Sequence, residues 1–313
     1  MPNFHLFIIN PAAGKHDQTE ELKKKIRSLF ESDPLLKGEP YEIAVTSEVG
    51  DATGITSLAA EKHPEGLRVY ACGGDGTLNE VVCGAAEKPH VAVCPVPVGS
   101  GNDFIKYYEN IPREKFLDLG ACAAGKASPC DLLRVNGHYC LNIASVGLDA
   151  ITAARQQKVK KIPLVSGSFA YKIALFYSFL SSMKNPIRLE VDGEAAVVGK
   201  GNLAIAAAGN GRFYGGGFKA TPTANISDGY IDFIAIPTIS RFKFLKYVGD
   251  YQKGNHMESM KDFLFYRRCK TVRLLSDKPL VVQADGEIFR LKDPEIEIVP
   301  AALNIILPDA GGE

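Results

Sequence analysis

The N-terminal part of the chain alternates between short apolar runs and amphipathic segments, and this pattern restricts the fold more than any other feature. Strands that alternate with helices in this way form a parallel sheet with crossover helices. The predicted strands are 5–9, 41–45, 67–72 and 91–94, and the predicted helices are 17–32, 51–63, 77–87 and 113–123. The pattern therefore predicts an α/β domain with a parallel sheet.

After about residue 128 the pattern changes to pairs of strands joined by tight turns. Asn136-Gly137 and Asp192-Gly193 each stand between two apolar runs, and such dipeptides are strong signals of a β-hairpin. Further predicted strands are 203–208, 230–236, 271–275, 280–284 and 295–299, and predicted helices are 166–183 and 241–251. The sequence thus predicts an α/β domain over residues 1–128 and an antiparallel β-sandwich with helices over residues 129–299.

Composition excludes several classes of protein. The chain has 313 residues, 46% of them hydrophobic, and its 36 basic and 36 acidic side chains leave no net charge. This length suffices for two buried cores, and the lack of a basic excess argues against nucleic acid as a partner. Seven cysteines without Cys-x-x-Cys spacing predict reduced thiols and a cytoplasmic protein. The apolar segment 163–183 is too polar for a membrane span, and the oligomeric state is open, with a homodimer as one option.

A glycine-rich loop, residues 73–77, reads Gly-Gly-Asp-Gly-Thr between a predicted strand and a predicted helix. Glycines let the backbone approach a ligand closely, and N–H groups beside a helix N-terminus bind phosphate. Asp75 would repel a phosphate unless a metal ion or a proton lay between them. The loop therefore indicates nucleotide chemistry with Mg²⁺, although Gly-Asp-Gly on its own is more often an ordinary turn.

Two more loops of small polar residues follow predicted strands of the same sheet. Residues 10–14 read Asn-Pro-Ala-Ala-Gly, and residues 99–104 read Gly-Ser-Gly-Asn-Asp-Phe. The carboxyl ends of parallel strands meet at one edge of a sheet, where α/β folds bind ligands, and Thr46 ends a strand on that edge. Lys15 is followed by His16 rather than Ser or Thr, which excludes a P-loop. Each loop alone fits an ordinary turn, but together they predict a nucleotide site.

The second half of the chain contains two candidate acidic sites. Asn225 and Asp228 precede a predicted strand, and their oxygens could hold one hard cation; an Asx turn explains them equally well. Asp285 and Glu287 are separated by one residue, Gly286, so in an extended chain both side chains would face the same way. Such a pair could divide metal contact and general-base work. Residues 192–194 are the same Asp-Gly-Glu tripeptide in a predicted hairpin. Spacing alone does not show which pair is catalytic.

These motifs, in this order over nearly the whole chain, resemble the catalytic fold of the diacylglycerol kinase family, in its soluble bacterial lipid kinase branch. The matching stretches are 10–14, 73–80, 99–104, 142–149, 209–211, 228–229 and 285–287. NAD kinases and sphingosine kinases share the Gly-Gly-Asp-Gly-Thr core, whereas the loop 99–104 and the later Asp-Gly-Glu are typical of lipid kinases. The resemblance implies two domains with a cleft between them, the first completed by about residues 300–313.

The resemblance also implies roles for individual residues. Relatives often carry a second Asp at the position of Asn225, so this metal site has lost one formal charge. The implied catalytic residues are Glu287, Asp285 and Asp75, and the implied metal ligands are Asn225, Asp228 and the carbonyl of Tyr230. The implied nucleotide contacts are Asn10, Pro11, Ala12, Ala13, Gly14, Thr46, Gly73, Gly74, Asp75, Gly76, Thr77 and Ser100.

The implied reaction is ATP-dependent transfer of a γ-phosphate to a lipid hydroxyl, such as diacylglycerol to phosphatidic acid in phospholipid metabolism, with Mg²⁺ as cofactor. Glu287 would be the general base and Asp285 would orient it; the reverse assignment is an alternative. The protein would meet its lipid at a membrane surface without a transmembrane span. Two other functions stay open: NAD kinase-like phosphorylation of a soluble acceptor, and a non-catalytic nucleotide-sensing module.

Overall fold

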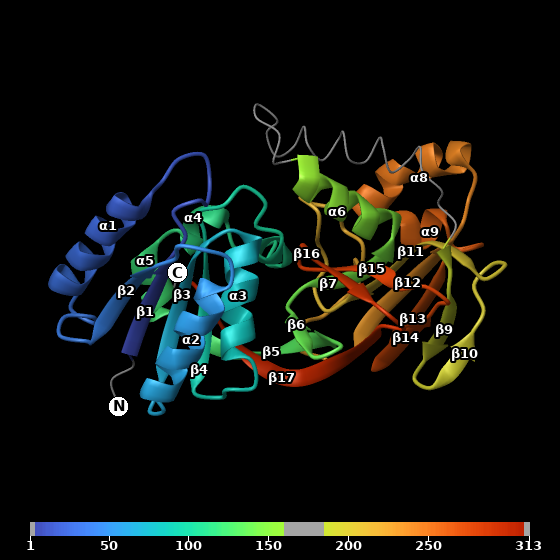
Figure 1. Ribbon diagram of the computed structural model, residues 1–313. Helices are drawn as coiled ribbons and strands as arrows, with labels where there is room; N and C mark the ends of the chain where they lie inside the picture. Colours follow the sequence, from blue (N-terminus) through green and yellow to red (C-terminus); the bar gives the residue numbers. More distant parts are fainter. Residues whose placement is uncertain (1–3, 160–184, 310–313) are drawn as a thin grey trace. The chain divides into compact units, whose positions relative to one another are not determined.

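A computed structural model describes residues 4–159 and 185–309 of the chain (Figure 1). The predicted helix at 166–183 lies outside these residues. The chain divides into two compact units, one made of Met1–Leu132 with Pro300–Glu313 and the other of Leu133–Val299. In the described part of the chain, no helix is long and apolar enough to cross a membrane.

A parallel sheet forms the centre of the first unit. Its strand order is β17-β4-β3-β1-β2, and all four neighbouring pairs are parallel. The strands are β1 (Phe4–Ile9), β2 (Tyr41–Val45), β3 (Leu67–Gly73), β4 (Val91–Pro97) and the final part of β17 (Glu295–Leu307), with β5 (Lys126–Val135) beside β17. The predicted α/β fold with a parallel sheet is confirmed.

Successive side chains of a strand point to opposite faces of the sheet. Apolar side chains therefore lie on both faces of this sheet, and helices cover them. On β1, Phe7 and Ile9 pack against α1 (Thr19–Ser32) and α5 (Leu119–Ala124). Leu6 and Ile8 point the other way and are also fully buried. α2 (Asp51–Lys62) and α3 (Asp75–Ala85) pack against each other, and α3 contacts β3 and β4 (Figure 1). Burial of both faces explains why these strands are continuous apolar runs.

Several boundaries in this unit differ from the prediction by two or three residues, and two of the differences concern helix starts. The segment 113–123 is two helices, α4 (Arg113–Phe116) and α5, because Asp118 accepts the N–H groups of Gly120 and Ala121 at 3.0 and 3.1 Å and so starts a new helix as its N-cap. α3 begins two residues earlier than predicted, directly after Gly74. Asp75 therefore belongs to the first turn of a helix rather than to a loop.

Two antiparallel sheets form the second unit and share one hydrophobic core. One sheet has the order β13-β12-β11-β7-β15-β16 with β8 beside β11, and the other contains β10-β9-β14 and the first part of β17. The strands are β6 (His138–Cys140), β7 (Ile143–Gly147), β8 (Asn185–Pro186), β9 (Arg188–Val191), β10 (Glu194–Ala196), β11 (Asn202–Gly209), β12 (Ile231–Pro237), β13 (Phe265–Cys269), β14 (Thr271–Leu275), β15 (Leu280–Ala284) and β16 (Glu287–Leu291). This arrangement is the predicted antiparallel sandwich.

Helices pack on the face of the seven-stranded sheet that points away from the sandwich core. They are α6 (Leu148–Val159), α8 (Arg241–Lys253) and α9 (His256–Ser259). β11 shows the division, since Ala206 and Ala208 belong to the sandwich core, whereas Ile205 and Ala207 pack with Tyr251 of α8. The helix predicted at 241–251 is confirmed as α8. α6, α9, β8, β13 and β16 were not among the predicted elements.

Candidate active site

Three loops of the first unit meet at the carboxyl ends of β1, β3 and β4. The backbone N–H of Asn10 donates to the carbonyl of Cys72 at 3.0 Å, and Asn10 Nδ2 donates to Thr77 Oγ1 at 2.9 Å. The N–H of Gly99 donates to the carbonyl of Gly73 at 3.0 Å. The loops that the sequence predicted at one sheet edge are therefore in direct contact.

The contact between the loops at 73–77 and 99–104 depends on glycine. A Cβ on Gly99 would lie 2.5 Å from the Cα of Gly74, and a Cβ on Gly73 would lie 2.3 Å from the side chain of Thr77. A larger residue at position 99 would push the two loops apart, and one at position 73 would displace Thr77 within its own loop. Gly74 precedes α3 and has no side chain that could cap it. The N–H groups at such a helix start attract a phosphate.

Asp75 joins the same two loops. Its Oδ1 accepts the N–H of Asp103 at 2.5 Å, and the Asp103 carboxylate pairs with Lys106 at 2.5 Å. Burial, and then repulsion from Asp103, raises the pKa of Asp75 above its ordinary value. A cation near this carboxylate would oppose the shift, and a magnesium-bound nucleotide would supply one.

The other predicted nucleotide contacts lie along the same edge. The buried Thr46 donates its N–H to the carbonyl of Ile9 at 3.0 Å, which places it next to Asn10. Asn10 Oδ1 accepts the N–H of Ala12 at 2.9 Å and so bends the loop 10–14. Ser100 is exposed. The remaining residues are half-buried (Pro11 and Ala13) or exposed (Gly14 and Gly76).

In the second unit, Asp285 and Gly286 form the turn between β15 and β16. Both have positive φ, 46° and 89°, as a type I′ hairpin turn requires. Asp285 accepts the backbone N–H groups of residues 141–143 at 2.6 to 3.1 Å. Glu287 starts β16 and is exposed. The expectation that both carboxylates face the same way in an extended chain does not apply, because the chain turns between them.

Residues 141–143 bring together motifs that are distant in the sequence. Besides Asp285, they bind Asn210, whose Nδ2 donates to the carbonyl of Leu141 at 2.7 Å, and Gly211, whose N–H donates to the carbonyl of Asn142 at 2.9 Å. Burial raises the pKa of Asp285 to about 6, although the backbone N–H groups favour its charged form. Perturbed carboxyls of this kind concentrate at functional sites.

The predicted metal ligands lie on the loop before β12. Asn225 Oδ1 accepts the N–H and the hydroxyl of Ser227 at 3.2 Å, and Asp228 Oδ1 accepts the N–H of Tyr230 at 3.0 Å. Asp228 Oδ2 binds Arg268 Nη2 at 2.6 Å. Within the described ranges, no group of three or more His, Cys, Asp and Glu side chains could hold a metal ion. These oxygens suit Mg²⁺ in type, but they fit a cation only if Arg268 moves away.

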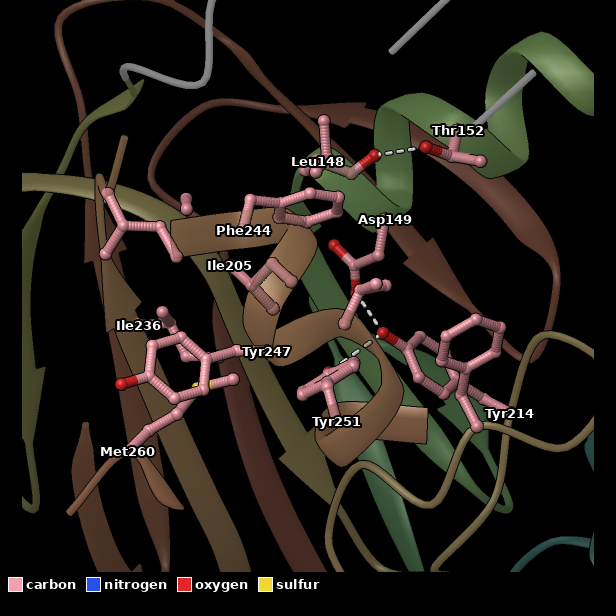
Figure 2. A pocket seen from close by; sticks show the side chains of 14 residues that line it. Leu148, Asp149, Thr152, Ile205, Tyr214, Ile236, Phe244, Tyr247, Tyr251 and Met260 are labelled. Carbon is pink, nitrogen blue, oxygen red and sulfur yellow. Dashed lines mark hydrogen bonds between the residues drawn. The ribbon is translucent and has the colours of Figure 1, made fainter. Parts of the chain in front are cut away.

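The second unit also contains an apolar pocket, which was not predicted from the sequence (Figure 2). Of the described residues that line it, only Asp149 carries a charge. The Tyr214 hydroxyl donates to Asp149 Oδ2 at 2.8 Å and lies 3.0 Å from the hydroxyl of Tyr251 (Figure 2). Burial raises the pKa of Asp149 to about 6. The apolar lining includes Leu148, Ile205, Ile236, Phe244, Tyr247 and Met260. Two signals in the sequence point to Asp149: it is an acidic residue inside the apolar run 143–151, and it ends the stretch 142–149 that resembles lipid kinases.

Comparison with known proteins identifies both halves of the chain. Residues 5–135 match the model of the diacylglycerol kinase catalytic domain, and residues 142–307 match that of the YegS C-terminal NAD kinase beta sandwich-like domain. A diacylglycerol kinase from Staphylococcus aureus (strain MRSA252) is 30% identical over 287 residues, which cover 90% of this chain and 84% of that protein. The "Probable lipid kinase YegS-like" of Xanthomonas campestris pv. campestris (strain 8004) is 30% identical over 318 residues, covering 98% and 97%.

Solved structures share the fold. A diacylglycerol kinase from Bacillus anthracis str. Sterne has a TM-score of 0.69 at 21% identity, and another structure from the same organism has a TM-score of 0.75 at 24% identity. Each covers 99% of this chain and 98% of the other. With both family models and near full-length relatives matched, the chain belongs to the diacylglycerol kinase-like lipid kinase family.

Proposed function

We propose that this kinase transfers the γ-phosphate of ATP to a lipid hydroxyl, converting diacylglycerol to phosphatidic acid in phospholipid metabolism. The observation that carries the choice of a lipid is the apolar pocket of the second unit, whose described lining has one charged side chain, Asp149. Acyl chains need apolar walls, whereas a dinucleotide such as NAD needs many polar partners. The Staphylococcus aureus relative, named a diacylglycerol kinase, supports the same acceptor.

ATP would bind at the three loops of the first unit. The N–H groups of residues 73–77, at the start of α3, would hold the phosphates, with residues 10–14, Thr46 and Ser100 around them. Phosphoryl transfer depends mainly on positioning and on neutralising charge at the γ-phosphate. The Mg²⁺ that accompanies ATP as part of the substrate would supply this neutralisation, and Asp75 would contact that ion or its water.

Glu287 would accept the proton of the attacking hydroxyl, and Asp285 would position it. Each Asp285 oxygen already accepts two backbone N–H groups of residues 141–143, so this carboxylate holds the turn in place. Glu287 follows the turn on the exposed start of β16, where a substrate hydroxyl could reach it. The hydrogen bonds thus favour Glu287 over the reverse assignment.

A Mg²⁺ ion held by Asn225, Asp228 and the carbonyl of Tyr230 stays a prediction. When bound, it would add positive charge to the start of β12, a role that Arg268 fills here through its ion pair with Asp228. No step of the proposed reaction depends on this ion.

A cytoplasmic location with peripheral contact to a membrane is part of the proposal, and a homodimer remains a prediction. The seven cysteines, all among the described residues, form no disulfide, and six of them are buried. Buried reduced thiols are typical of proteins in a reducing compartment.

A radiolabelled-ATP assay against a panel of lipids in mixed micelles, with NAD as a soluble acceptor beside them, tests the proposed function. We expect label in phosphatidic acid and none in NADP. Transfer to NAD with no labelled lipid would establish the NAD kinase-like alternative. Full cellular activity of Asp75→Asn and Glu287→Ala variants would instead favour a nucleotide-sensing module that performs no chemistry.

A further inference from the structure

α8 carries a second apolar face on the side opposite the pocket. At 3.6 residues per turn, Phe244, Tyr247 and Tyr251 share one side of the helix, and all three line the pocket. Phe242 and Leu245 lie on the other side and are 87% and 59% exposed. Phe242 is the most exposed aromatic side chain of the described residues. A helix that is apolar on two sides, with one side open to solvent, calls for a second contact.

Basic side chains surround the exposed pair. α8 holds four basic residues and one acid, Asp250, in a chain whose net charge is zero. Lys243 Nζ lies 5.7 Å from the centre of the Phe263 ring, and Lys246 Nζ lies 5.1 Å from that of Tyr247. Both lysines are exposed. Lys246, four residues after Phe242, lies on the same side of α8 as the apolar pair, and Lys243, three residues before Lys246, lies next to it on the helix surface. The face therefore combines apolar insertion with positive charge.

We propose that the face of α8 formed by Phe242, Leu245, Lys243 and Lys246 docks on an anionic lipid bilayer. The apolar side chains would enter the boundary between headgroups and acyl chains, and the lysines would bind headgroup phosphates. Two apolar side chains on a helix with four basic residues and one acid are too small a patch for a stable protein interface, which buries about 800 Å² on each partner. The inference rests on the proposed function, because a lipid acceptor has to be drawn from a bilayer.

A single tryptophan gives a direct test, because the chain contains none. Phe242→Trp places the probe on the face without disturbing the core. With vesicles of phosphatidylglycerol and phosphatidylcholine, we expect its emission to shift to the blue and to be quenched by brominated acyl chains. Val197→Trp, directly after β10 in the same unit, is the matched control and should show neither effect, since the native Val197 is 84% exposed. No response at position 242, or equal responses at both positions, would overturn the proposal.

Sedimentation with the same vesicles tests the face without a probe. Phe242→Ser combined with Leu245→Ser should weaken binding by at least about tenfold, and Lys243→Gln combined with Lys246→Gln by a similar factor. Val197→Ser should bind like the wild type, and added salt should weaken wild-type binding. If the serine double variant bound vesicles normally but lost a dimer in equilibrium sedimentation, the face would be a contact between copies and the proposal would be wrong.

The docking proposal and the proposed function can be tested separately. Dioctanoylglycerol, a short-chain acceptor dispersed in solution, requires no docking. If it is phosphorylated while Phe242→Trp gives no vesicle response, the docking proposal is wrong and the proposed function stands. If the vesicle response is present but no lipid is phosphorylated, the proposed function is wrong, and α8 still binds a bilayer.

Discussion

The two Asp-Gly-Glu hairpins of the second unit, residues 192–194 and 285–287, have the same turn and different surroundings. The Asp φ angles are 51° and 46°, and the glycine that follows has positive φ in both. Asp192 is exposed and accepts the N–H groups of residues 270–271 at 2.8 and 2.9 Å. Asp285 is half-buried and accepts those of residues 141–143. The tripeptide therefore specifies the turn in both places.

The surroundings separate a structural hairpin from a candidate catalytic one. Glu194 pairs with Arg267 at 2.9 Å, so its charge is already balanced. The residues that hold Asp285 also bind Asn210 and Gly211, two parts of a motif shared with lipid kinases. Burial raises the pKa of Asp285 to about 6. Contacts between distant residues, absent from the tripeptide itself, distinguish the two sites.

The largest expected effect is on kcat, and it distinguishes Glu287 from Glu194. Glu287→Gln keeps the shape of the side chain but removes the proton acceptor, so we expect kcat for lipid phosphorylation to fall by about 10³-fold. Glu194→Gln is the matched control and should change kcat by less than about twofold, because it breaks only an exposed ion pair. Initial rates with radiolabelled ATP measure both. Equal losses would show that the surroundings do not distinguish the hairpins.

The anchoring carboxylates should differ in their effect on stability. Asp285→Ala leaves the backbone N–H groups of residues 141–143 without an acceptor, and we expect the free energy of unfolding to fall by about 3 kcal/mol. Asp192→Ala should lower it by about 1 kcal/mol, because water can replace an exposed carboxylate. Urea denaturation followed by circular dichroism measures both values. A larger loss at Asp192 than at Asp285 would reverse the comparison.

The raised pKa of Asp285 predicts how stability depends on pH. Its folded pKa, about 6, exceeds its unfolded value, so the folded state binds the proton more tightly and the free energy of unfolding falls as the pH rises from about 4 to 6. Asp149, with a pKa raised to about 6, acts in the same window. Asp285→Asn and Asp149→Asn should each reduce this fall by about 1–2 kcal/mol, measured by urea denaturation at pH 4 to 7. If the free energy of unfolding fell more steeply with pH in either variant than in the wild type, the pKa of that carboxyl would not be raised in the folded state.

The smallest expected effect is on Mg²⁺ binding near Arg268, the residue that follows Arg267, the partner of Glu194. Arg268 forms an ion pair with the Asp228 carboxylate, and Asn225 carries no charge. We therefore expect the loop that holds Asn225 and Asp228 to bind Mg²⁺ weakly. Asn225→Asp combined with Arg268→Gln would place two carboxylates on this loop and remove the ion pair with Arg268. Calorimetry should then show a melting temperature about 2–4 °C higher in Mg²⁺ than in EDTA for the double variant, and little difference for the wild type. A larger difference in the wild type would show that Arg268 does not exclude the ion.

Local patterns in the sequence were sufficient for the fold class and for the loops at the sheet edge. The strands 41–45, 271–275 and 280–284 were predicted to the residue, because alternating or continuous apolar runs and turn dipeptides are local signals. α6 was missed because its apolar residues show little helical periodicity. Asp149 belongs to the stretch 142–149 that resembles lipid kinases, but its place in a pocket lining was not predicted. The pairing of Arg268 with Asp228 arises only when β13 lies beside β12. The nucleotide, catalytic and metal roles remain predictions.

A single-turnover measurement on both hairpins tests the central claim most directly. The matched double variants are Asp285→Asn/Glu287→Gln and Asp192→Asn/Glu194→Gln, and rapid quench follows phosphate transfer from bound ATP to dioctanoylglycerol. We expect the first variant to bind ATP but transfer no phosphate above background, and the second to transfer it at the wild-type rate. Wild-type transfer by the first variant, or equal loss in both, would contradict a lipid kinase site at residues 285–287.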